Sequence, residues 1–253
     1  MKHITSALLC AAVFAGAIAS AQVASVNVVG YTTFDVTAAT DWRQVPVQFK
    51  DATDGTAAKL SGISAANGLV ANDMIMVLVS NGGNPVYAQY KWNGTAWAKN
   101  ATYAVDGSGA ATETTTPEVT DVTFGIGTVV WFKRGDSEGS RSLSLQGEVA
   151  TAATSVSLAT GYNLVSNPNP TDALTLSSWT GALKLKDQIL VQAAANTPTS
   201  FNLYTRRASG WQQSGTSTVT ETITVPAGCV MWYVKATGST IASITLPATI
   251  SAE

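Results

Sequence analysis

Carboxylates are the residues of this sequence with the widest choice of chemistry, because other catalytic side chains are scarce. The 253 residues hold 16 acidic side chains but one histidine and two cysteines. Two carboxylates can act as the acid and base of a glycosidase. Asp73 and Asp187 stand in matching positions, each opening an apolar run, where an aspartate more often accepts backbone N–H bonds in a turn. We therefore predict no catalytic residue and a protein that is not an enzyme.

The first 21 residues have the features of a secretory signal peptide. Lys2 and His3 form a short basic start, residues 7–18 are apolar, and Ala-Ser-Ala at 19–21 is a cleavage site. The apolar run is too short to span a bilayer. The sequence therefore predicts a mature chain that begins at Gln22, without a membrane span, located outside the cell or on its surface.

Removal of this leader leaves few groups for metal or nucleophile chemistry. The mature chain has no histidine, which excludes Ser–His–Asp and Cys–His catalysis and His-based zinc sites. Three acids could bind calcium, but no calcium-loop pattern surrounds them: Asp51, Asp54 and Asp106. We predict no metal and no cofactor. Cys229 has no intrachain partner, so it is either a small buried residue or half of an intermolecular disulfide.

Charge and short motifs also narrow the choice of partners. Of 14 basic residues only Lys2 lies in the leader, so 13 remain against 16 acidic ones, a net charge of about −3. A mildly acidic chain lacks the positive footprint of a nucleic-acid-binding protein. Residues 134–137 spell the cell-adhesion tetrapeptide Arg-Gly-Asp-Ser, but residues 235–238 do not repeat it, so we interpret it as a plain turn.

The elements that must position these residues are short strands. β-Branched and aromatic runs separated by Gly, Pro and Asn predict strands at 26–36, 44–49, 74–79, 86–92, 95–99, 119–124, 128–133, 142–149, 154–158, 163–166, 188–192, 201–206, 211–214, 219–225, 229–234 and 241–246. Short helices are expected at 57–65 and 172–179, and a mobile surface loop at 100–117. Such a pattern favours an all-β fold of sandwich or barrel-like domains.

The chain is also built twice. Residues 42–47 align with 162–167, 60–97 with 174–211, and 127–149 with 228–250, without gaps inside each block. A self-similarity longer than a solenoid period indicates two tandem domains. We predict a first β domain at 22–149 and a second at 150–253, each with at most one short helix.

An aromatic hairpin recurs in both copies. Asn93-Gly94 predicts a two-residue type I′ turn, which places Trp92 opposite Thr95 and Tyr90 opposite Trp97. Five rings belong to the two hairpins: Tyr90, Trp92, Trp97, Tyr204 and Trp211. They either face the core, which we favour, or form a platform on which sugar rings stack.

Four motifs carry a resemblance to a known group of proteins. They are V-N-V-V-G-Y at 26–31, Y-x-W-N-G-x-x-W at 90–97, G-x-x-V-W-F at 127–132 and L-x-L-x-G-E-V at 143–149. With them the chain resembles tandem β-domain secreted or surface proteins of the Verrucomicrobia–Planctomycetes group. The second copy lacks Asn-Gly in its hairpin and the Gly-Glu pair in its last strand. The resemblance implies an envelope or extracellular role and brings no known activity.

These observations predict a secreted structural protein, a subunit of an extracellular filament or surface layer. Its opening strand would associate with the sheet edge of a neighbouring copy through Val26, Val28, Val29, Gly30 and Tyr31. Pairing of this strand within its own domain is the other outcome. The alternative function is a carbohydrate-binding or adhesive surface module, with glycans as partners.

Overall fold

The computed structural model describes residues 29–36, 42–53, 55–80, 86–105, 111–113, 122–136, 141–176, 186–194, 200–239 and 241–249. As the sequence predicts, the fold is all-β, with antiparallel strands and short 3-10 turns such as η1 (Leu60–Gly62) and η2 (Ala65–Asn67). Among the described residues, none of the helical segments has the length and hydropathy to cross a membrane.

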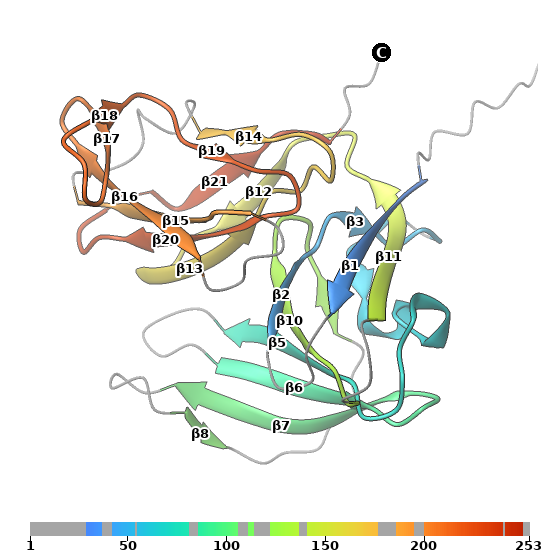
Figure 1. Cartoon of the computed structure of the whole chain (residues 1–253). Helices are drawn as coiled ribbons and strands as arrows, with labels where there is room; N and C mark the ends of the chain where they lie inside the picture. The colour runs from blue at the N-terminus through green and yellow to red at the C-terminus, as the bar shows by residue number, and fades with distance from the viewer. Residues whose placement is uncertain are drawn as a thin grey trace, which may run out of the picture.

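Two six-stranded sheets form the frame of the molecule (Figure 1). The first runs in the order β2 (Arg43–Pro46), β10 (Val129–Lys133), β5 (Met74–Ser80), β6 (Val86–Trp92), β7 (Trp97–Val105) and β8 (Ala111–Glu113). The second runs β13 (Gly161–Ser166), β20 (Val230–Lys235), β15 (Gln188–Gln192), β16 (Phe201–Arg207), β17 (Gly210–Gln213) and β18 (Val219–Thr220). Both sheets have the same strand order, whereas the domain boundary at residues 149 and 150 stays a prediction.

Smaller sheets accompany these two. In the first half, β11 (Arg141–Val149) lies between β1 (Val29–Val36) and β3 (Phe49–Lys50), and β4 (Ala58–Lys59) pairs with β9 (Thr123–Phe124). In the second half, β12 (Thr154–Ser157) pairs with β21 (Ser243–Leu246), and β14 (Leu174–Thr175) with β19 (Thr224–Val225). Figure 1 shows β1 and β11 side by side, next to the first six-stranded sheet.

Each half has its own core of buried apolar side chains. In the first half, Ile75 and Phe132 of the large sheet join Phe34 of β1 in one cluster. In the second, Ile189 and Tyr233 join Ile244 of β21. Alternation along each strand produces this result, because every second side chain of a strand faces the same side of its sheet.

A third cluster connects the two halves. Val129, Leu164 and Val230 are buried together, and three larger rings pack partly buried against them: Trp131, Phe201 and Trp232. The backbone contributes as well, since the Ser166 N–H donates to the Gly127 carbonyl at 2.7 Å. The halves therefore meet through the outer faces of their large sheets, near β10 and β13 (Figure 1).

Three local predictions were wrong where the structure describes them. The helix expected at 57–65 is replaced by β4, η1 and the start of η2. At 172–179, Leu174 and Thr175 form β14, while 177–179 lie outside the described residues. The loop expected at 100–117 begins as strand, because β7 continues to Val105 against β6 and then pairs with β8. A neighbouring strand that offers backbone bonds outweighs the weak strand propensity of Ala and Asn.

Candidate functional site

The opening strand is paired with its own chain. Val29, Gly30 and Tyr31 of β1 lie opposite Glu148, Gly147 and Gln146 of β11. This pairing does not test whether the strand also associates with a neighbouring copy, so that hypothesis stays a prediction. Pairing within the domain, the other outcome left open by the sequence, is the one observed. Val26 and Val28 lie outside the described residues.

Two glycines explain why β1 fits this position. Gly30 and Gly147 face each other, and a Cβ on Gly30 would lie 2.9 Å from the ring of Phe49. A Cβ on Gly147 would fall against the Lys50 carbonyl oxygen. The two bare positions let the buried Phe49 ring and β3 approach the β1–β11 ladder, a close approach that only glycine allows.

The other side of β1 is open among the described strands. β1 lies at the edge of its three-stranded sheet, and its eight residues make it the longest edge strand in the described part of the chain. Val29 is 60% exposed and Tyr31 77% exposed. Asp35 is the one charged residue of β1, so this edge has little of the charge or proline that usually prevents strand addition.

The aromatic hairpin has a different register from the predicted one. Trp92 lies opposite Trp97, and Tyr90 opposite Lys99, so the loop holds four residues instead of two. The Asn93 side chain causes the change, because its Oδ1 accepts the N–H groups of Thr95 and Ala96 at 2.9 and 2.8 Å. Asn93 therefore forms an Asx-type turn, in which its side-chain oxygen accepts backbone N–H groups of the loop.

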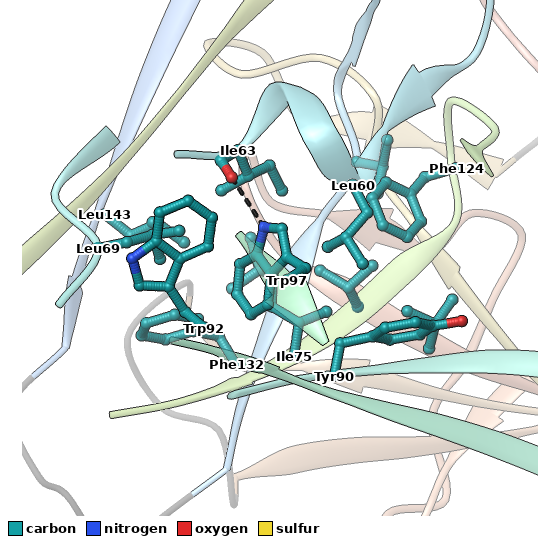
Figure 2. Packing of buried hydrophobic residues seen from close by; sticks show 14 of the residues in the cluster. Leu60, Ile63, Leu69, Ile75, Tyr90, Trp92, Trp97, Phe124, Phe132 and Leu143 are labelled. Carbon is teal, nitrogen blue, oxygen red and sulfur yellow. Dashed lines mark hydrogen bonds between the residues drawn. The ribbon is translucent and has the colours of Figure 1, made fainter. Parts of the chain in front are cut away.

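The rings of the hairpins lie in the core. Tyr90, Trp92 and Trp97 are 4%, 5% and 8% exposed, and Trp211 is fully buried. Figure 2 shows Trp97 between Trp92 and Leu60, with its Nε1–H donating to the Ile63 carbonyl at 2.8 Å. Tyr204 packs against the second core. The core-facing interpretation is confirmed for the four buried rings, which leave no face for a sugar to stack on, while Tyr204 is half-buried.

A different group of rings reaches the surface. Tyr162 of β13 is 65% exposed and meets Trp232 edge to face, with 6.2 Å between ring centroids. The ring centroids of Trp131 and Trp232 lie 6.5 Å apart. Sequence reasoning missed this group, although alternation along β10 and β20 was a signal. Trp131 and Trp232 occupy the strand positions that point away from the cores.

The two matching aspartates organise turns. The fully buried Asp73 carboxylate accepts the N–H groups of Val70 and Gly135 at 2.9 and 2.8 Å, and Arg141 binds both of its oxygens at 2.7 and 2.6 Å. This confirms the predicted acceptor role. The bidentate Arg141 pair, formed across 68 positions, was not predicted.

Asp187 has the same backbone role with different side-chain partners. It accepts the Ala236 N–H at 2.8 Å and the Tyr233 hydroxyl at 2.7 Å, and Ser239 Oγ lies at 3.3 Å. Burial, followed by the Asp187 hydrogen bond and charge, raises the pKa of Tyr233 well above its ordinary value. The phenol therefore stays a donor to Asp187 throughout the physiological range.

The adhesion tetrapeptide is folded into the protein. Arg134 is 2% exposed and donates to the Val36 carbonyl and to Asp136, the latter at 2.8 Å from Nε. This hydrogen bond, together with the nearby Arg141, lowers the pKa of Asp136 below its ordinary value. A buried arginine bonded to its own aspartate is not available to a receptor, which supports the interpretation as a turn.

The remaining sequence candidates are structural or lie elsewhere. Cys229 is fully buried, and burial raises its pKa to about 11. Asp51 accepts the Thr53 N–H and lies 3.8 Å from Lys59, whereas Asp54 and Asp106 lie outside the described residues. Within the described ranges, no three His, Cys, Asp or Glu side chains are grouped so as to hold a metal ion.

Comparison with known proteins identifies no relative. Neither the protein-family models, nor the curated proteins, nor the solved structures contain a match to this chain. The resemblance stated from the sequence motifs therefore stays a prediction. Among the described residues, the open edge of β1 is an exposed feature with a defined chemistry of association.

Proposed function

We propose that the chain is a secreted, non-enzymatic structural protein that assembles with copies of itself into an extracellular filament or surface layer. The observation that carries the proposal is the open edge of β1, with Val29 and Tyr31 exposed on it. A strand edge offers a row of backbone N–H and C=O groups, and a second strand satisfies them. The predicted signal peptide supports export to the outside of the cell, where such a filament or layer would form.

The open edge favours strand addition without exchange of the strand. β1 stays on β11 in its own subunit, and the strand of a neighbouring copy adds on the other side, extending the three-stranded sheet. If the β1 edges of two copies pair with each other, the contact closes a dimer. If the β1 edge of one copy pairs with a different edge of the next copy, the contact repeats and gives a fibre. The proposed filament or layer requires the second arrangement.

Lysines on the exposed edge test this proposal. In the double variant Val29→Lys/Tyr31→Lys, we expect a folded protein that remains monomeric in sedimentation velocity and forms no assemblies in negative-stain micrographs. Val70→Lys is the matched control, because Val70 is exposed at 40% but lies outside any strand. Assembly of the double variant at the wild-type level would contradict the proposal.

The site of secretion is tested separately. Protein recovered from the cell exterior should have the intact mass of a chain that begins at Gln22. Material that keeps residues 1–21 would contradict export by a cleaved signal peptide. This result bears on location alone and leaves the role of β1 to the assembly experiment.

A glycan-binding or adhesive module is the second candidate, and the exposed Tyr162 ring favours it. Tyr162 projects at the seam of the two halves, beside Trp232, and an aromatic face of this kind suits a sugar ring. Binding on a glycan array that disappears in Tyr162→Ala would support this function. An array without signal for the wild-type protein would leave self-assembly as the proposed function.

A further inference from the structure

A partly open cavity of about 220 Å³ lies in the first half, and no β1 residue is among those that line it. Its walls are mainly apolar, with Ile63, Phe124, Val130 and Leu145 among the lining residues. An apolar cavity of roughly 150 Å³ is large enough to bind benzene. The space is therefore sufficient for a small organic molecule.

One buried polar side chain in this wall has no hydrogen bond among the described residues. Gln48 lines the cavity and is 1% exposed, and neither its Nε2 nor its Oε1 has a partner among the described residues. A buried amide without bonds is costly, and native proteins rarely retain one without a reason. An amide can give and accept one bond each along one edge, which is the pattern of a second amide.

The second half contains a buried side-chain amide whose hydrogen bonds are satisfied. Asn167, which follows β13 as Val47 and Gln48 follow β2, is also fully buried. Its Nδ2 donates to the carbonyls of Asp172, Val225 and Pro226, and its Oδ1 accepts the Asn169 N–H. A buried amide in this region of the fold is thus fully bonded in one half and without bonds in the other.

The charges at the cavity also restrict the ligand. Lys50, Lys59 and Asp51 line it, and Lys59 and Asp51 lie 3.8 Å apart, so the charges of this pair offset each other. Such a pair gives no preference for an anion or a cation. The apolar walls and the buried, unbonded amide of Gln48 together suit a ligand with an apolar body and an amide group.

We propose that this cavity is a binding site for a small neutral molecule with an apolar body and one amide group. The apolar body fills the space between Ile63, Phe124 and Leu145. The amide of the ligand exchanges a pair of hydrogen bonds with Gln48, which turns toward it about its side-chain torsions. The site needs no second copy of the chain.

Benzamide is a suitable probe, and toluene and acetophenone are its controls. Toluene has no hydrogen-bonding group, and acetophenone has an acceptor but no donor. In ligand-observed NMR titrations of the purified full chain, we expect saturable binding that is tightest for benzamide. Binding of toluene as tightly as benzamide, or no saturable binding of benzamide, would overturn the proposal and leave a cavity that holds only water.

Substitution of Gln48 assigns the effect to its amide. Gln48→Met keeps the length of the side chain and removes both hydrogen-bonding groups. We expect it to weaken benzamide binding by roughly tenfold or more and to leave toluene binding unchanged, since two hydrogen bonds are lost. Gln44→Met is the matched control, because Gln44 is also buried, at 4% exposure, but does not line the cavity.

The folded state of the variants is checked by far-UV circular dichroism and thermal unfolding. Removal of an unbonded buried amide should leave the midpoint of Gln48→Met equal to or above that of the wild type. If Gln48→Met does not fold, the comparison of the three probes on the wild-type protein still tests whether the cavity prefers an amide. Equal benzamide binding by Gln48→Met and the wild type would refute the role of Gln48.

Discussion

Trp97 and Trp211 occupy matching positions but differ in one hydrogen bond, and this difference predicts unequal costs of substitution. Trp97 donates its Nε1–H to the Ile63 carbonyl at 2.8 Å, as Figure 2 shows. The Nε1 of Trp211 is buried and has no hydrogen-bond partner among the described residues. Replacement by phenylalanine removes the N–H in both cases and keeps an aromatic ring.

The expected difference follows from the two N–H groups. Trp97→Phe loses a hydrogen bond with a net value of about 1 kcal/mol, whereas Trp211→Phe removes an unsatisfied buried donor, which recovers about 1 kcal/mol or more. Both variants lose a similar ring volume. Trp97→Phe should therefore lower the free energy of unfolding by about 2 kcal/mol more than Trp211→Phe.

Urea unfolding followed by far-UV circular dichroism measures this difference without relying on tryptophan fluorescence. Trp97→Ala and Trp211→Ala serve as references, and each should cost about 3–5 kcal/mol, as for other buried aromatic residues. If the halves unfold in separate transitions, each variant should shift only its own transition. The reasoning is refuted if Trp97→Phe costs no more than Trp211→Phe.

Three further predictions concern charges and glycines. Arg141→Met leaves the buried Asp73 without its bidentate partner, and urea unfolding should show a loss of about 3–5 kcal/mol. Gly147→Ala should cost about 1–3 kcal/mol through collision with β3, whereas Gly62→Ala, with open space around it, should be close to neutral in the same assay. The pKa of Asp136 in the folded protein is lowered from 3.8, so its carboxylate stabilises the fold above that pH. This stabilisation is lost as the pH falls through the folded pKa. The difference in stability between the wild type and Asp136→Asn should therefore disappear in unfolding curves measured in acid.

Much of the fold could be predicted because it depends on local patterns. Alternation of apolar residues places Val130 and Phe132 in the first core, and the buried Asp73 keeps the turn role that its position before an apolar run indicates. Such signals involve residues within a few positions of each other. They do not depend on which distant strand becomes the neighbour.

The features that were not predicted depend on distant partners. Arg141 reaches Asp73 from 68 positions away, and the cavity beside Gln48 is bounded by residues from Val47 to Gln146. The pairing of β1 shows the same limit. The sequence of β1 suits a strand on any open edge. The fit of Phe49 against Gly30 and Gly147 favours pairing with β11, and this fit exists only after the chain has folded.

The hairpin at Asn93 shows why the composition of a core is easier to predict than the register of its strands. The predicted and observed pairings of Trp97 differ by two positions, from Tyr90 to Trp92. Because side chains alternate with a period of two, a shift of two keeps every ring on the same face, whereas a shift of one would have turned Trp97 toward solvent. Either pairing therefore leaves the rings buried. The choice between them was made by three hydrogen bonds at the Asn93 side chain, two from the backbone and one from the Thr95 hydroxyl, which stabilise the longer loop.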